Sequence, residues 1–252
     1  ENWGVKEGIE TIPVKIQSFI NGDKIYVRLE SEIPDVTYKI RWDGKDMELD
    51  GDFSVYQDLI LHTFQVRDWK LSVKVFKNGK QYGEPVEQYF EKHKAIGAKV
   101  RYNQPYSKYY EAAGDRALVD GRTGIIEFRD GNWQGFWGKD LDVELDLGNE
   151  KEITTVLMMV NEYQNSWIFR PSALKIELSV DGKYWVELVD KTFPEAKPDN
   201  KKKRLAFFGK SDKGPLKARY IKIHLKNYGK VPEWHEAAGQ DCWLFLDEIQ
   251  VE

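Results

Sequence analysis

Alternation of apolar and polar residues with a period of two constrains this sequence more than any other feature. Because successive side chains of a strand point to opposite faces, such a segment predicts a strand with one buried face. Six segments show the pattern: KIYVRLE (24–30), VTYKIRW (36–42), LSVKVFKNG (71–79), DVELDLG (142–148), LKIELSVDG (174–182) and YIKIHLK (220–226). No long amphipathic helical pattern interrupts them. The predicted fold class is all-β, with antiparallel β-sandwiches.

Turn signals and length predict two domains. Asn-Gly and Asp-Gly pairs, at Asn21-Gly22, Asp43-Gly44, Asn78-Gly79 and Asp181-Gly182, separate the predicted strands. The 252 residues suffice for two domains, and strand-rich sequence stops and restarts near EKHKAIGAKV (91–100). We therefore expect a small immunoglobulin-like sandwich over residues 1–94 and a larger β domain over residues 95–252.

Composition argues against several partners. The formal net charge is -4, and the one basic run, KPDNKKKR (197–204), contains no aromatic residue on which a base could stack. No apolar run reaches the length of a membrane span. We expect neither nucleic-acid binding nor membrane insertion. The single cysteine, Cys242, is expected to fill core space, and the absence of an initiator Met leads us to expect a processed chain or a piece of a longer one.

Motifs of catalysis are not evident. The four histidines are far apart in the sequence, and no Gly-x-Ser-x-Gly elbow occurs. The adjacent pair Asp247-Glu248 lies in WLFLDEIQV, a predicted last strand, where neighbouring side chains point to opposite faces unless a bulge intervenes. We expect no catalytic residues in this chain.

Five segments of the second half, in order, carry a family resemblance. They are ALVDGRTG (117–124), NWQGFWGKDLDVELDLG (132–148), SWIFRPSALKIELSVDGKYW (166–185), ARYIKIHLKN (218–227) and CWLFLDEIQV (242–251). Together they resemble the discoidin or coagulation factor V/VIII type C domain, in the form of family 32 carbohydrate-binding modules. The resemblance implies a galactose-binding-like jelly roll over residues 95–252.

The first half carries a second resemblance. VTYKIRWDGKDM (36–47) and LSVKVFKNGKQYGEP (71–85) look like the small β domain that follows the catalytic barrel of chitobiases and β-hexosaminidases, family 20 glycoside hydrolases. The usual Ser-Glu-Pro after Asp43-Gly44 is missing, and so is the barrel itself. The resemblance implies a spacer from an exported bacterial enzyme, located in the periplasm, on the cell surface or outside the cell.

Loops rich in aromatic and polar residues are the candidate glycan site. An aromatic plane can lie against the C–H face of a pyranose while amides and a guanidinium bond its hydroxyls. Of the nine Trp residues we expect Trp133, Trp185 and Trp243 in the core, and we leave Trp167 open between core and ligand. The candidates come from NEYQNSWIFRP (161–171), VPEWHEAAGQ (231–240) and GFWGKD (135–140): Tyr163, Asn165, Trp167, Arg170, Trp234, His235 and Trp137.

The family resemblance also implies a structural calcium ion. Its ligands would come from the Asp-Gly loop and the last strand, here Asp120, Thr123 and Glu248. Oxygen ligands of this kind suit calcium. Arg122 stands where a small polar residue is more usual, and an ordinary Asp120-Gly121 turn is the alternative.

These observations lead to an expected function. The chain is expected to be a non-catalytic carbohydrate-binding accessory region of an exported bacterial glycoside hydrolase, with a β-N-acetylhexosaminidase as the parent enzyme. Its partners would be glycans ending in galactose, N-acetylgalactosamine or N-acetylglucosamine, and the covalently attached catalytic domain. Three alternatives stay open: a structural brace that binds nothing, an adhesion module for protein or lipid, and an autonomous glycosidase that uses Asp247 and Glu248.

Overall fold

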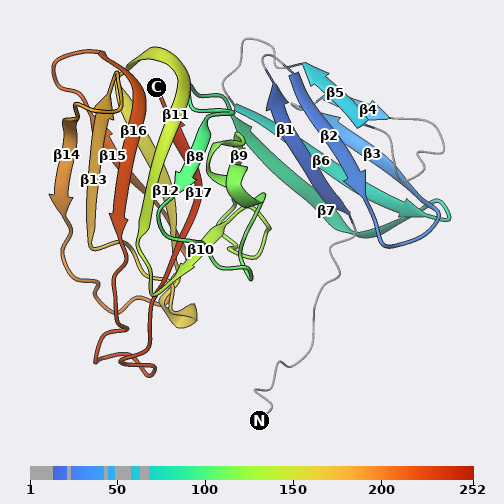
Figure 1. Ribbon diagram of the computed structural model, residues 1–252. Helices are drawn as coiled ribbons and strands as arrows, with labels where there is room; N and C mark the ends of the chain where they lie inside the picture. The colour runs from blue at the N-terminus through green and yellow to red at the C-terminus, as the bar shows by residue number, and fades with distance from the viewer. Residues whose placement is uncertain (1–13, 22–23, 43–44, 49–57, 63–67) are drawn as a thin grey trace. The chain divides into compact units, whose positions relative to one another are not determined.

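The chain forms two compact units of nearly continuous β-structure. The structure is a computed structural model that describes residues 14–21, 24–42, 45–48, 58–62 and 68–252. The units are Glu1–Tyr89 and Phe90–Glu252, and each is described separately below. Both units consist mainly of antiparallel β-sheets, so the all-β prediction is confirmed (Figure 1).

The N-terminal unit contains two antiparallel sheets. One has the order β1-β2-β5, with β1 (Lys15–Asn21), β2 (Lys24–Glu30) and β5 (Asp58–His62). The other has the order β4-β3-β6-β7, with β4 (Lys45–Glu48), β3 (Val36–Trp42), β6 (Asp68–Lys77) and β7 (Lys80–Glu91). Alternate residues are buried as predicted, for example Tyr38 and Ile40 on β3 and Val73 and Val75 on β6. The expected turns at Asn21-Gly22 and Asp43-Gly44 lie outside the described residues, apart from Asn21.

The C-terminal unit is built on two larger sheets. The first has the order β10-β17-β12-β15, with β10 (Gln134–Trp137), β17 (Trp243–Val251), β12 (Thr155–Glu162) and β15 (Lys203–Lys210). The second has the order β14-β13-β16-β11-β8, with β14 (Val186–Thr192), β13 (Ala173–Ser179), β16 (Leu216–Lys226), β11 (Leu141–Ile153) and β8 (Lys99–Tyr102). Short elements complete it: β9 (Arg122–Thr123) and the 3₁₀ helices η1 (Gly114–Val119) and η2 (Gln164–Ser166).

The core of the C-terminal unit follows from the alternation. Leu141, Val143 and Leu145 of β11 are wholly buried, while the residues between them are partly exposed. Ile221 and Ile223 of β16 belong to the same cluster, which also takes residues from the other sheet. Each such side chain contributes roughly 1.5–3 kcal/mol when it is fully buried. The scaffold that holds the loops is therefore set by the period-two pattern.

Loops gather at one end of this unit. The 227–242 connection and η2 lie at the lower end in Figure 1, while β17 runs away from them toward the C-terminus. β10 is antiparallel to β17, so it ends where β17 begins, at that same end. Segments far apart in sequence therefore meet there.

The division between the units falls between Tyr89 and Phe90, not between Lys94 and Ala95 as the sequence led us to expect. Contacts of the intervening residues explain the difference. The Lys94 N–H donates to the Val251 carbonyl (2.8 Å), and His93 Nε2 lies 2.8 Å from Glu248 Oε1. The segment 90–94 thus joins the C-terminal unit through its last strand.

Three tryptophans expected in the core have different surroundings. Trp133 is 1 % exposed, as predicted. Trp185 is partly exposed, with the Lys222 ammonium 3.7 Å from its ring centroid. Trp243 is also partly exposed, although it packs against the buried cluster that contains Trp133 and Phe245, so the prediction of full burial is wrong for both Trp185 and Trp243. Cys242 is wholly buried, as expected, and burial raises the pKa of its thiol to about 12.

Candidate functional site

Four aromatic side chains form a continuous row at the loop end of the C-terminal unit. This aromatic row consists, in order of contact, of Tyr110, Trp243, Trp137 and Trp167, with neighbouring ring centroids 5.3, 4.9 and 5.9 Å apart. The β-ladder pairs Trp137 with Trp243, which places these two side by side. All four side chains are partly exposed. Each ring therefore packs on a neighbour while part of its surface stays open to a ligand.

Backbone bonds fix Trp167 at the end of the row. Its backbone is left-handed, with φ 60° and ψ 20°. The Trp243 N–H donates to the Trp167 carbonyl (2.8 Å), and the Phe169 N–H donates to the Trp243 carbonyl (3.1 Å). A bulky residue in this region costs of order 1–3 kcal/mol, and such strain clusters at functional sites. The sequence had left Trp167 open between core and ligand, and in the structure it is partly exposed while it packs against the buried cluster that contains Phe169 and Cys242.

The polar candidates of the 163–170 loop have intramolecular partners. Arg170 donates from Nε and Nη2 to the two carboxylate oxygens of Glu162 (2.8 and 2.9 Å), and Glu162 is 1 % exposed. This carboxylate raises the pKa of Arg170. Tyr163 is partly buried with the Lys202 ammonium 5.2 Å from its ring centroid, whereas Asn165 is exposed. Of these side chains, Asn165 is the one placed openly toward solvent.

The second candidate loop is tied to the first through His235. Its Nε2 lies 3.1 Å from the Gln164 carbonyl oxygen, and the Ala237 N–H donates to Nδ1 (3.1 Å). Nδ1 is therefore the acceptor and Nε2 carries the proton that it donates. The neighbouring Trp234 packs on Phe169 with centroids 6.2 Å apart and is 43 % exposed. His235 thus holds the two loops together, and Trp234 presents its ring to solvent.

Buried amides that the sequence did not single out organise these loops. The side-chain amide of Asn227 donates to the carbonyls of Lys139 and Cys242 (3.1 Å each), which joins the loops at the ends of β10 and β16. Gln134 is wholly buried and donates to the Gly114 carbonyl (3.0 Å), which anchors the first residue of η1. An isolated Asn or Gln beside a strand gives no sequence signal for such a role.

A second set of polar groups surrounds the acidic pair of β17. Between β12 and β17 the register shifts: Val160 pairs with Leu246, and Met158 pairs with Ile249. One extra residue of β17 is therefore accommodated at Asp247 and Glu248, which is a β-bulge. Opposite faces were expected only in the absence of a bulge, and the bulge observed here removes that arrangement.

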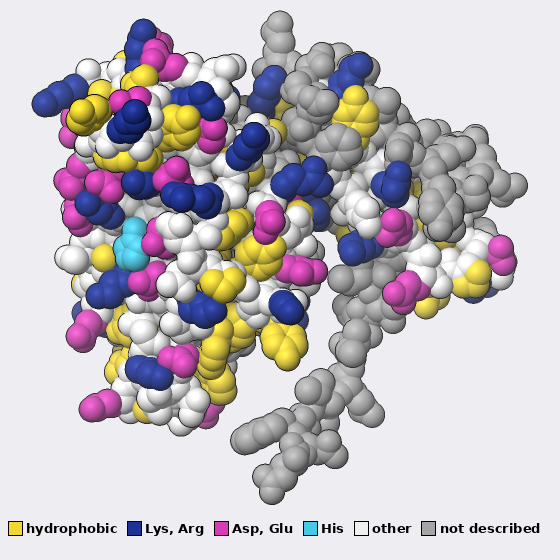
Figure 2. Space-filling view, viewed as in Figure 1, with side chains coloured by type: hydrophobic (Ala, Val, Ile, Leu, Met, Phe, Trp, Pro, Cys, Tyr) yellow, Lys and Arg dark blue, Asp and Glu magenta, His cyan; other side chains and the backbone are white. Residues whose placement is uncertain are grey.

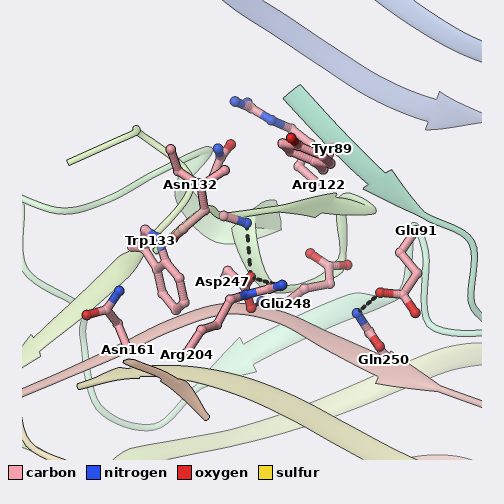
Figure 3. A network of polar contacts seen from close by, with 12 residues as sticks. Tyr89, Glu91, Arg122, Asn132, Trp133, Asn161, Arg204, Asp247, Glu248 and Gln250 are labelled. Carbon is pink, nitrogen blue, oxygen red and sulfur yellow. Dashed lines mark hydrogen bonds and ion pairs between the residues drawn. The ribbon is translucent and has the colours of Figure 1, made fainter. Parts of the chain in front are cut away.

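Both carboxyl groups instead bond the segment around β9. Asp247 Oδ2 accepts from the Gly124 N–H (3.0 Å) and from Arg204 Nη2 (2.8 Å) (Figure 3). Glu248 Oε1 accepts from the Gly121 N–H (2.9 Å) and from His93 Nε2 (2.8 Å). Asp247 and Glu248 are wholly buried, so neither carboxyl is open to a sugar as a glycosidase acid would be.

The proposed calcium ligands lie in the same region. Burial raises the pKa of Asp120 to about 7, and burial together with the charge of Asp120 raises the pKa of Glu248. Glu248 Oε2 has no hydrogen-bond partner, and Thr123 is buried beside Gly124. Within the described ranges, no three His, Cys, Asp or Glu side chains converge as a metal cluster. Any bound cation would therefore need backbone or hydroxyl oxygens in addition to the two carboxylates.

Three solved carbohydrate-related structures have a low similarity to this chain. A CBM32 module from a family 31 glycoside hydrolase of Clostridium perfringens is 16 % identical with a TM-score of 0.37, and the alignment covers 62 % of this chain and 94 % of that one. A fucose-binding module of Streptococcus pneumoniae is 17 % identical with a TM-score of 0.39, with coverage of 64 % and 97 %. The lectin domain of lectinolysin complexed with Lewis B antigen is 18 % identical with a TM-score of 0.40, with coverage of 64 % and 96 %.

Comparison by sequence gives the family. No curated protein matches this chain. None of the helices in the described part of the chain has the length and apolarity to cross a bilayer. The F5/8 type C domain family matches residues 99–239, which is more than half of the chain and lies within the C-terminal unit. The chain therefore belongs to the F5/8 type C domain family.

Proposed function

We propose that this protein binds glycans without catalysing their cleavage, through the aromatic row and the neighbouring Trp234. The observation that carries the proposal is the row itself: four contacting, partly exposed rings at the loop end, where buried amides hold the adjoining segments in place. Aromatic rings bind the apolar C–H faces of pyranoses, and rigid loops supply them without a large ordering cost. Membership of the F5/8 type C domain family supports the same function.

We also propose that the protein works as an accessory region of an exported bacterial glycoside hydrolase, with a β-N-acetylhexosaminidase as the parent. The resemblance of the first half to the domain behind the chitobiase barrel supports this. Tethering through the N-terminal unit would keep the catalytic domain close to its polysaccharide and raise its effective concentration. Galactose, N-acetylgalactosamine and N-acetylglucosamine termini are the first ligands to examine.

A glycan array with matched variants tests the binding proposal. The wild-type chain should bind a defined set of glycans, and the double variant Trp167→Ala, Trp234→Ala should lose at least ten-fold in affinity while staying folded. Tyr184→Ala is the matched control, because Tyr184 is an aromatic residue 81 % exposed that lies outside the row. Equal binding by the double variant, or no binding by the wild type, would overturn the proposal.

The structural-brace alternative makes a different prediction about these rings. A brace that binds nothing should bury its aromatic residues against protein, yet Trp234 is 43 % exposed in this chain. An adhesion module for anionic lipid would favour basic neighbours, whereas Glu233 and Glu236 flank the Trp234-His235 pair. The glycan-binding proposal is compatible with both the exposed Trp234 ring and its acidic neighbours.

We further propose that Asp120, Thr123 and Glu248 contribute to a calcium site. The unpartnered, wholly buried Glu248 Oε2 supports it, because a buried acceptor without a donor or cation is costly. Burial raises the pKa of both Asp120 and Glu248, and a divalent cation beside them would stabilise their charged forms. The ion would fix the segment between η1 and β9 to the last strand.

Thermal unfolding with calcium and with a chelator tests the site. Binding to the folded state alone at about 100 times Kd stabilises by about 2.7 kcal/mol, which corresponds to a rise of roughly 5–10 °C in Tm. The rise should vanish in Glu248→Gln, which keeps one oxygen but loses the charge. Identical Tm values of the wild type in calcium and in chelator would contradict the proposal.

A further inference from the structure

An apolar patch lies at the end of the C-terminal unit opposite the loops. β16 begins at that end with Leu216 and finishes at Lys226, where the 227–242 connection starts. Three exposed side chains there come from the connection between β13 and β14 and from the start of β14: Val180, Tyr184 and Val186, which are 49, 81 and 61 % exposed. Figure 2 shows hydrophobic side chains at the upper left, interspersed with basic and acidic ones. Apolar side chains gathered on a surface mark a site of contact, and we call this group with Leu178 and Leu216 the end patch.

The turn that carries Tyr184 is ordered by its own contacts. The carboxylate of Asp181 accepts from the backbone N–H groups of Lys183 and Tyr184 (2.9 and 3.0 Å). These donors lower the pKa of Asp181, so its carboxyl stays charged. The next ring, Trp185, is held by the Lys222 ammonium, 3.7 Å from its centroid. A side chain on such a fixed turn loses little conformational freedom when a contact buries it.

A pocket of about 280 Å³ adjoins the Tyr184 ring. Its apolar walls are Leu178, Val180, Val186 and Leu216. The volume is below the roughly 300–1,000 Å³ of pockets that enclose whole small-molecule ligands. One large apolar side chain from another protein surface is therefore the occupant that fits it.

The end patch has the properties of a surface that pairs with a copy of itself. In a two-fold contact the same patch faces its own copy, so the patch must be self-complementary. Tyr184 projects beside the pocket, which provides both a protruding ring and a recess for one. The exposed charges around them have both signs: Lys217 lies 3.4 Å from Glu150, and Asp181 and Lys183 are neighbours in the turn. A two-fold axis can set cations of one copy opposite anions of the other, whereas a strongly acidic or basic partner gains no net attraction.

We propose that two copies of this chain associate through the end patch, with Tyr184 of each copy in the pocket of the other. The loop ends of the two C-terminal units then point away from each other. Such a pair bridges two separate glycans, a consequence that rests on the proposed function, whereas the association itself does not. Because an immobilised glycan meets one loop end at a time, binding to an array does not depend on Tyr184.

Sedimentation velocity of the full chain over about 5–500 µM tests the association, because the population of a dimer rises with concentration by mass action. We expect a monomer–dimer equilibrium. Tyr184→Ser and Val186→Glu should each raise the dissociation constant at least about ten-fold, as expected for central contact residues. Both positions are exposed, so each variant should fold as the wild type does. Phe208→Ser is the matched control, because Phe208 is 53 % exposed on β15 and lies outside the end patch.

The outcomes separate this contact from other forms of association. A wild type that stays monomeric over the whole concentration range overturns the proposal. A dimer that is lost in Phe208→Ser but kept in Tyr184→Ser would assign the contact to β15 and overturn the role of the end patch. Species larger than a dimer would indicate a head-to-tail contact and contradict the two-fold arrangement. None of these outcomes bears on glycan binding, which the array tests by itself.

Discussion

At the scale of single residues, the loop end is held by a few buried side chains that have distant partners. Asn227 donates to the carbonyls of Lys139 and Cys242, and its own oxygen accepts from the Gly229 N–H (2.9 Å). An amide with its donors and acceptor both used in this way rigidifies the loops around it. The geometry of Trp137 and Trp243 depends on that anchor, because both neighbour the carbonyls that it binds.

Asn227→Ala is expected to destabilise the protein by about 2–4 kcal/mol, since two buried carbonyls lose their donor. The free energy of unfolding, measured by urea denaturation, checks this value. Asn165→Ala is the control, because Asn165 is exposed and its change should stay within about 0.5 kcal/mol. A loss no larger than that of the control would show that Asn227 does not anchor the loops.

Arg204→Met should destabilise the protein by about 2–4 kcal/mol at pH 7, because Asp247 is wholly buried and loses its cation. Burial already raises the pKa of Asp247 to about 6, above the unfolded value of about 3.9. Between about pH 3.9 and pH 6 the folded state therefore keeps a proton on Asp247 that the unfolded state has lost. The stability that protonated Asp247 contributes is fully present below about pH 3.9 and is lost as the pH rises through 6.

The loss in Arg204→Met should accordingly shrink at pH 5, where the protonated Asp247 needs no cation. Urea denaturation of wild type and variant at both pH values, in chelator, measures the difference. If Arg204→Met lowers the free energy of unfolding equally at pH 5 and pH 7, the unpaired charge of Asp247 is not the cause of the destabilisation.

At the scale of elements, short strands and tight turns position the residues of the aromatic row. β10 ends at Trp137, and the next residue, Gly138, has φ 59° and donates from its N–H to the Cys242 carbonyl (2.9 Å). A methyl group at position 138 would lie 2.8 Å from Cγ of Asp241. Only glycine fits this turn without displacing Asp241 or the backbone next to Trp137.

Gly138→Ala should therefore cost about 2–3 kcal/mol, from left-handed strain and from the clash, and should weaken glycan binding by moving Trp137. Gly148→Ala is the control for backbone strain, because Gly148 has a similar φ of 79°. It lacks the clash, since nothing lies within 4 Å of the carbon that alanine would add there. The difference in unfolding free energy between the two variants measures the clash. Equal losses, with unchanged binding in Gly138→Ala, would mean that the turn does not position the row.

At the scale of the whole molecule, the C-terminal unit depends on the segment that leads into it. Phe90 is 1 % exposed, the Glu91 N–H donates to the Gly121 carbonyl (2.8 Å), and His93 bonds Glu248. The segment therefore pins both the β9 region and the last strand. It is a part of the C-terminal unit, although in sequence it looks like the joint between domains.

Two fragments test where the unit begins. Residues 90–252 should unfold cooperatively, while residues 95–252 should be less stable by at least about 3 kcal/mol, because the latter loses buried Phe90 and the partners of Glu248 and Val251. Thermal and urea unfolding of both fragments give the comparison. Matching midpoints would favour the boundary at residue 94 that the sequence suggested.

The sequence by itself determined the strands and much of the family assignment. Alternation in DVELDLG and YIKIHLK predicted β11 and β16 because strand periodicity is a local property of the chain. Ordered segments such as SWIFRPSALKIELSVDG carried the resemblance to the family that matches residues 99–239. The sequence also identified aromatic residues in loops that the fold places at one end of the C-terminal unit, since turn residues and aromatic content are recognised locally.

Only the tertiary structure decided what each side chain does there. Arg170 and His235 look like sugar ligands in sequence, yet their partners within the fold already occupy them. Trp243 was expected in the core but lies in the aromatic row, and a bulge in β17 turned Asp247 and Glu248 toward the same segment. The physical reason is that hydrogen-bond and ring partners are chosen by long-range packing, which no local pattern encodes.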